Sequence, residues 1–118
     1  MNKFTLTWEA VQSFPVIFLD GDITADAERL LEDVYKEIAS QHNTKILMFD
    51  FSKVDYINSS GISAFIKVFR VHNETGGDFI FAGLSDHIKK VMDILELTDY
   101  VKVFKTIEMA IKHYKDTL

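Results

Sequence analysis

Two adjacent serines, Ser59 and Ser60, are the residues of this 118-residue sequence best suited to carry chemistry. They lie between Asn58 and Gly61, after an apolar run at 46–49 and before a stretch with helical periodicity. Asn and Ser side chains cap helix N-termini, so one of these side chains can cap while another hydroxyl faces solvent. Capping alone accounts for the cluster, and a functional hydroxyl is the alternative.

A phosphoryl group on such a hydroxyl would have favourable surroundings at a helix start. It would meet free backbone N–H donors and the positive end of the helix dipole, so the domain would tolerate it without unfolding. It would also add about −1.5 to −2 charge units to the surface. A partner that contacts the helix start closely would then be repelled. The cluster is therefore suited to a switch controlled by modification.

Two other groups of acidic residues offer competing hypotheses. The segment 20–24, Asp-Gly-Asp-Ile-Thr after four apolar residues, resembles the first motif of haloacid-dehalogenase-type phosphatases, in which one aspartate attacks phosphate and the second works with Mg²⁺. In that hypothesis Asp20 and Asp22 react, and Asp86 and Asp93 are the candidates for the late acidic pair. Asp50 at a strand end, with Lys105 near the last strand, would instead suit a receiver-like phospho-aspartate site.

Composition argues against several other classes of function. Cysteine is absent, which excludes disulfides and thiolate metal sites, and the histidines are too scattered to suggest a metal, so we expect no cofactor. Eighteen acidic residues against thirteen basic ones, with the lysines dispersed, argue against nucleic acid as a partner. No apolar run approaches the ~18 to 20 residues of a membrane span, so we expect a cytoplasmic protein without direct membrane insertion.

The elements that must position these residues follow from hydrophobic periodicity. Alternation at 4–9 and the apolar run at 16–19 predict an opening hairpin. Apolar runs at 46–49 and 79–82, and the partly apolar segment 101–104, predict three more strands. Helically spaced stripes predict four helices; their members are Ala27, Leu31, Val34 and Ile38, then Ile62, Phe65, Ile66 and Phe69, then Ile88, Val91, Met92 and Leu95, then Ile107, Ala110, Ile111 and Tyr114. Expected caps are Thr24, Ser85 and Thr106, with Gly76-Gly77 ending the second helix.

The predicted order is β-β-α-β-α-β-α-β-α within a single domain, 1–118. Strands that alternate with helices need crossover connections, so we expect an α/β fold: a mostly parallel sheet of about five strands with an N-terminal hairpin strand and four α-helices. Function in such sheets sits where strands end and helices begin. The junctions at 20–24, at 50–63, where a short loop is expected, and at 82–86 are therefore the candidate regions.

The segment 58–63 resembles the signature of STAS domains, in particular of bacterial anti-sigma factor antagonists. Their usual pattern is Asp-Ser-(Ser/Thr)-Gly-(Leu/Ile)-Gly, and four of its six positions match, with Asn58 in place of aspartate and Ser63 in place of glycine. The segment 19–24 resembles the family's earlier turn, and Gly76-Gly77 resembles its approach to the fourth strand. With the element order, the resemblance extends from near Phe4 to near Tyr114 and implies a STAS-like fold.

This resemblance implies a partner-switching regulator that is not an enzyme. An anti-sigma factor serine kinase would bind the unphosphorylated form and phosphorylate Ser59, with Ser60 the second choice, and a serine phosphatase would reverse the modification. The implied partner-binding residues are Asp22, Thr24, Asn58, Ser59, Ser60, Gly61 and Ser63. The alternative within the fold is a STAS subunit of a transporter or of a stressosome-like complex that is never phosphorylated.

Overall fold

The chain alternates strands and helices in the order that the sequence predicts. The computed structural model describes residues 2–42 and 45–117. Its elements are β1 (Thr5–Val11), β2 (Phe14–Ile23), α1 (Ala27–Gln41), β3 (Ile46–Ile57), α2 (Ser59–Asn73), β4 (Asp78–Ala82), α3 (Asp86–Ile94), the 3₁₀-helix η1 (Leu97–Asp99), β5 (Lys102–Phe104) and α4 (Ile107–Thr117). No helix in this part of the chain is both long and apolar enough to cross a membrane.

The strands form one five-stranded sheet in the order β1-β2-β3-β4-β5. β1 pairs antiparallel with β2, and every other neighbouring pair is parallel. The two-residue turn between β1 and β2 is made by Gln12 and Ser13, both with positive φ (50° and 76°), which matches the twist of a tight hairpin. The expected mostly parallel sheet with an N-terminal hairpin strand and four α-helices is confirmed.

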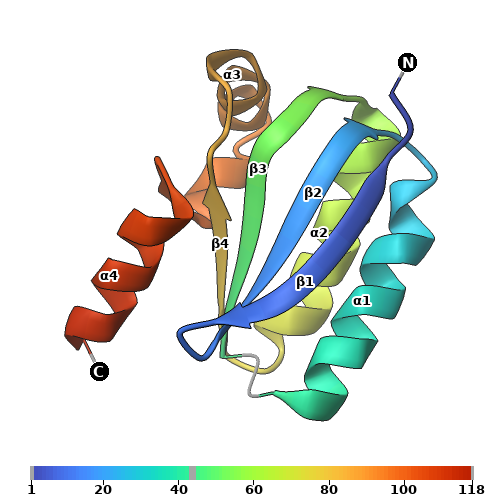
Figure 1. Ribbon diagram of the computed structural model, residues 1–118. Coiled ribbons are helices and arrows are strands. Elements are labelled where there is room, and N and C mark those ends of the chain that lie inside the picture. The colour runs from blue at the N-terminus through green and yellow to red at the C-terminus, as the bar shows by residue number, and fades with distance from the viewer. Residues whose placement is uncertain (1, 43–44, 118) are drawn as a thin grey trace.

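Helices cover the two faces of the sheet unequally. On one face, α1, α2 and α3 pack over a core that includes an aromatic cluster, in which the Phe51 and Phe81 rings lie 4.7 Å apart and the Phe49 and Phe65 rings 5.5 Å apart. On the other face, α4 packs over a smaller core that includes Met48. Figure 1 shows α1 and α2 side by side along the sheet and α4 apart from them, beyond β4. The starts of α1 and α2 therefore share one face.

Two strands extend further than the sequence predicts. β3 runs to Ile57 and leads directly into α2, so the expected short loop between them is wrong. Beyond Asp50 the buried Phe51, Val54 and Ile57 are separated by pairs of exposed residues, which hides the strand in the sequence. β2 supplies its backbone partners: Asp20 pairs with Lys53, and Asp22 with Tyr56. Irregularities in the register at these positions disrupt a simple alternation of buried and exposed residues.

The cap predictions are partly right. Ser85 Oγ accepts from Ile88 N at 3.2 Å, and Thr106 Oγ1 accepts from Met109 N at 3.1 Å, so these two are confirmed. Thr24 is not a cap: α1 begins after Asp26, and that residue makes no side-chain capping hydrogen bond. The reason is that β2 continues to Ile23, so the chain needs 24–26 to turn before the helix starts.

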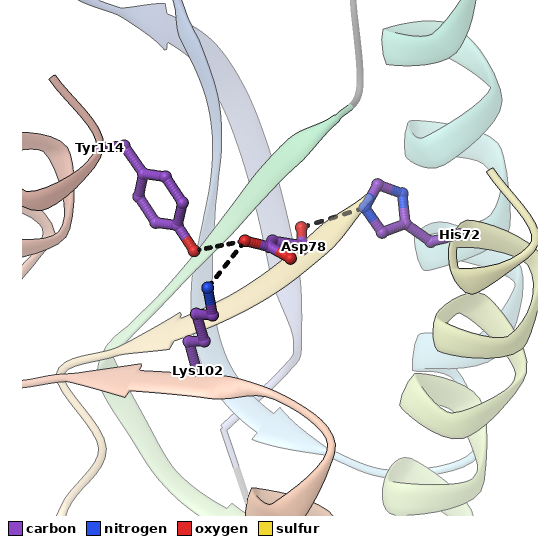
Figure 2. A network of polar contacts seen from close by, with 4 residues as sticks. All are labelled: His72, Asp78, Lys102 and Tyr114. Carbon is purple, nitrogen blue, oxygen red and sulfur yellow. Dashed lines mark hydrogen bonds and ion pairs between the residues drawn. The ribbon is translucent and has the colours of Figure 1, made fainter. Parts of the chain in front are cut away.

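The C-terminal end of α2 is tied to β4 by a network of polar contacts that is buried at His72 and exposed at Lys102 (Figure 2). His72 has no exposed surface, and its Nε2 lies 3.0 Å from the carbonyl oxygen of Asp78 while its Nδ1 lies 3.2 Å from the hydroxyl of Tyr35 on α1. The Asp78 carboxylate accepts from Lys102 Nζ at 3.0 Å and from the Tyr114 hydroxyl at 2.9 Å. The network thus links both helical layers through the first residue of β4.

Candidate functional site at the start of helix α2

Asn58 joins the ends of two strands to the start of α2. Its backbone is extended (φ −106°, ψ 179°), and its Oδ1 accepts from Gly61 N at 2.9 Å. Asn58 N donates to Ile23 O at 3.1 Å, and Asn58 O accepts from Ile62 N at 3.0 Å. Asn58 is therefore the N-cap of α2, and the end of β2 holds it in place.

Gly61 allows the first turn of α2 to lie directly against β2. A Cβ at this position would be 2.4 Å from Ile23 O and 2.8 Å from Ile23 Cγ2, which is closer than real Cβ contacts. The nearest of these atoms belongs to the backbone and cannot move aside cheaply. The glycine of the motif is thus required for packing, and it sets the position of the serines that precede it.

Ser59 and Ser60 occupy the first turn of α2 with exposed side chains. Asn58 supplies the cap, and neither serine hydroxyl forms a hydrogen bond with another residue in the described ranges. The backbone N–H groups of a first helical turn have no intrahelical acceptor, and the first turn of α2 contains no acidic residue. Neither serine therefore caps α2. Both hydroxyls are free, and they lie beside N–H donors and the positive end of the helix dipole.

Ser63 lies one turn after Ser59 on the same helix face and is exposed. It stands where the family pattern has glycine, and its side chain meets solvent. Ser59 and Ser63 thus form a continuous polar strip on the surface of the first two turns.

Asp22 and Thr24 lie at the same edge of the sheet as the start of α2. Asp22 is half-buried in β2, beside Tyr56 of β3, and its Oδ2 accepts from Asn2 N at 3.0 Å. Thr24 follows the last residue of β2, whose carbonyl holds Asn58. The structure therefore brings together all seven residues of the predicted partner-binding set, from two segments more than thirty positions apart in the sequence.

Sequence reasoning missed two residues at this edge, Asp55 and Tyr56. Both are exposed, and the aromatic side chain of Tyr56 retains 44% of its surface. They lie in the polar part of β3 that was expected to be a loop. Val54 and Ile57, on either side of Asp55 and Tyr56, are buried, so the two residues between them face solvent. The spacing of Val54 and Ile57 is the signal in the sequence that could have indicated this.

The competing acidic sites are not assembled. Asp20 lies within β2, whereas Asp86 and Asp93 are on α3 and line a different surface depression. Asp50 is within β3 instead of at its end, its Oδ1 accepts from Ser52 N at 2.9 Å, and no ion pair with Lys105 is present among the described residues. Within residues 2–42 and 45–117, no three His, Asp or Glu side chains are placed to bind a metal together.

Comparison with known proteins shows the family of the chain. The family model described as STAS domain matches residues 6–110 of the chain. This chain belongs to the STAS domain family. Among curated relatives, the anti-sigma-B factor antagonist of Listeria monocytogenes is 25% identical over 92 residues, which cover 78% of this STAS protein and 79% of the relative. The resemblance noted in the sequence to anti-sigma factor antagonists is confirmed.

Solved structures show the same fold. The unphosphorylated form of the anti-sigma factor antagonist SpoIIAA superposes with a TM-score of 0.72 at 19% identity, covering 96% of this chain and 98% of that one. The phosphorylated form of the Bacillus SpoIIAA gives a TM-score of 0.70 at 20% identity, with 95% and 99% covered. A sulfate transporter family protein from Wolinella succinogenes gives 0.75 at 16% identity, with 85% and 83% covered.

Proposed function

We propose that this STAS protein is a cytoplasmic anti-sigma factor antagonist, a non-enzymatic single domain that binds an anti-sigma factor serine kinase until Ser59 is phosphorylated. The observation that carries the proposal is the free, exposed hydroxyl of Ser59 at a helix start that Asn58 already caps. A kinase can reach this hydroxyl without breaking any hydrogen bond within the described chain. A serine phosphatase would restore the binding form. SpoIIAA, which has been solved in both phosphorylated and unphosphorylated forms, supports the proposal by analogy.

The docking surface in this proposal is the edge formed by the starts of α1 and α2 and the end of β3. It contains the exposed residues Ser59, Ser60 and Ser63 and the half-buried Asp22 and Thr24, and we add Tyr56, because exposed tyrosines at interfaces carry a large share of binding energy. A phosphate on Ser59 would place about −1.5 to −2 charge units at the centre of this surface. Backbone N–H groups would stabilise the phosphate, so phosphorylation would alter binding of the partner and leave the fold intact.

The direct test is incubation with ATP and the candidate kinase, followed by location of any phosphate by mass spectrometry. We expect modification of the wild type and of Ser60→Ala at residue 59, and none of Ser59→Ala. Phosphate on Ser60 in the wild type, or no phosphate at all, would contradict the proposal.

A binding measurement separates the effect of charge from the effect of its position. Ser59→Asp is expected to weaken kinase binding at least tenfold, which corresponds to about 1.4 kcal/mol. The matched control is Asn73→Asp, which adds one negative charge to an exposed position at the opposite end of the same helix. Equal affinities for the two variants would place the partner on another surface.

A second candidate function is that of an unphosphorylated STAS subunit of a transporter or a stressosome-like complex. Asn58 favours it, because an amide next to Ser59 leaves the helix start without the carboxylate that the usual motif supplies. Asn58→Asp restores that carboxylate while keeping an oxygen acceptor for Gly61 N. If the kinase modifies this variant and not the wild type, the second candidate replaces the first.

A further inference from the structure

A second surface with binding character lies between the C-terminal halves of α1 and α2. It is an open groove of about 740 Å³. Its apolar lining comes from Tyr35 and Ala39 on α1 and from Val68 and Val71 on α2, and Val71 keeps 53% of its surface exposed. Figure 1 shows the two helices running side by side. Tyr35 and Val68 form the buried floor of the groove, and Ala39 and Val71 are its exposed apolar residues.

The charges along the groove are arranged unequally. At its N-terminal end, Lys67 pairs with Glu28 across the two helices, and Glu32 lies close by. The hydrogen bond and the negative charge of Glu28 hold the pKa of the Lys67 ammonium above its usual value. The positive charge of Lys67 is therefore already matched by acidic residues at this end of the groove.

Further toward the C-terminal ends of the two helices, the groove has two cationic side chains without partners among the described residues. Lys36 of α1 and Arg70 of α2 are exposed, one from each helix, and neither side chain forms a hydrogen bond or ion pair with any residue that the structure describes. The chain as a whole has a net charge of −5. Two unpaired cations beside an apolar strip are thus a local exception to the acidic character of the protein, and they favour an occupant with the opposite charge.

We propose that this groove binds an acidic amphipathic helix from a partner protein. The apolar face of that helix would pack on Tyr35, Val68 and Val71, and carboxylates at its flanks would pair with Lys36 and Arg70. A groove between two helices suits recognition of a third helix through apolar residues spaced three and four apart. The pairing of cations from both walls would set the position of the partner along the groove.

The groove acts independently of the surface at Ser59, so this inference goes beyond the proposed function. Residues 67–71 follow Ser59 by 8 to 12 positions, which is about 12–18 Å along the helix. Exposed charges separated by more than the Debye length, about 8 Å at physiological salt, are largely screened. A phosphate on Ser59 is therefore expected to leave binding in the groove unchanged.

The experiment is a titration of the isotope-labelled protein, followed by NMR amide shifts, with a 15-residue helical peptide that has leucines at positions spaced three and four apart and glutamates on both flanks. A matched peptide has lysines in place of the glutamates. We expect shifts confined to the C-terminal halves of α1 and α2 and an affinity at least tenfold weaker for the lysine peptide. The double variant Lys36→Glu with Arg70→Glu should lose binding. The control double variant Lys90→Glu with Lys112→Glu, on exposed positions of α3 and α4, and the variant Ser59→Asp should keep it.

Several results would overturn the inference. Equal affinity for the two peptides would show that the groove does not select charge, and absent shifts or shifts at another surface would show that it is not the binding site. Self-association in sedimentation that Val71→Asp abolishes would make the groove an interface between copies. Binding to anionic phospholipid vesicles that the double variant Lys36→Glu with Arg70→Glu abolishes would make it a lipid surface. Loss of peptide binding in Ser59→Asp would refute the independence of the two surfaces.

Discussion

The two ends of helix α2 are built in opposite ways. At the N-terminal end, Ser59 and Ser60 are exposed and their hydroxyls have no partner within residues 2–42 and 45–117. At the C-terminal end, His72 is fully buried and both of its ring nitrogens have partners. The same helix thus has one end anchored in the core and one end left available. Because the anchoring does not depend on the serines, they can be modified or contacted without loss of the fold.

The anchored end also determines the protonation of His72. The carbonyl oxygen of Asp78 can only accept a hydrogen bond, so Nε2 carries the proton and Nδ1 accepts from the Tyr35 hydroxyl. Burial lowers the pKa of the imidazole, against the opposing effect of the Asp78 carbonyl and carboxylate. Burial also disfavours ionisation of the Asp78 carboxyl, but the hydrogen bonds from Lys102 and Tyr114 outweigh it and hold its pKa below the usual value. A neutral ring therefore satisfies every partner at this end.

The largest expected effect comes from a substitution that forces the N-terminal end of α2 away from the sheet. Gly61→Ala places a Cβ 2.4 Å from Ile23 O, so the first turn of α2 must shift. We expect a loss of about 2–3 kcal/mol in the free energy of unfolding, as for other overpacked sites, measured by chemical denaturation. Ser60→Ala, on the exposed neighbour, is the control and should change stability by less than about 0.5 kcal/mol. A Gly61→Ala variant as stable as the wild type would show that this end is not held by β2.

The second test concerns how the free energy of unfolding depends on pH through His72, which is buried at the C-terminal end of α2. The unfolded chain protonates His72 near pH 6.5, whereas the folded protein resists protonation, so below that pH the unfolded state binds more protons. Stability from this residue is present above about pH 6.5 and is lost as pH falls towards the lowered pKa, by up to about 1.4 kcal/mol per pH unit. Denaturation measured between pH 7 and pH 5 should show this slope.

The variant His72→Gln should reduce that slope, and His87→Gln, at an exposed position on α3, should retain it. A wild-type stability that does not change between pH 7 and pH 5 would mean that the buried end does not discriminate between the two protonation states.

The smallest effects are expected at the cap. Asn58→Ala removes the acceptor for Gly61 N and should cost about 1 kcal/mol in the free energy of unfolding. Asn58→Asp keeps the acceptor and adds a negative charge at the positive end of the helix, for a gain of about 0.3–1 kcal/mol. Thermal denaturation at low salt measures both. Equal stability of the alanine and aspartate variants would indicate that Asn58 does not cap α2 in solution.

Much of the fold was predictable because hydrophobic spacing is a local property. The helical stripe that begins at Ile62 and the apolar runs at 46–49 and 79–82 were enough to predict the element order. The extension of β3 to Ile57 was not predicted, since it depends on pairing with β2, some thirty positions earlier in the sequence, and the spacing of its apolar residues is irregular. The partners of His72 on α1 and β4 were not predictable, because they depend on contacts between elements.

The cluster of Asn58, Ser59, Ser60 and Gly61 also combines features that the local sequence indicates with features that depend on tertiary contacts. Residue types alone indicated a helix start with one capping side chain and at least one spare hydroxyl, because Asn, Ser and Gly favour that local geometry. Three contacts of the folded chain decided which residue has which role: the end of β2 holds the Asn58 backbone, Asn58 caps Gly61, and Gly61 leaves no space against Ile23. Two of these contacts involve β2, which lies far from the cluster in sequence, so the roles of the four residues are set only in the folded chain, where β2 lies against the start of α2.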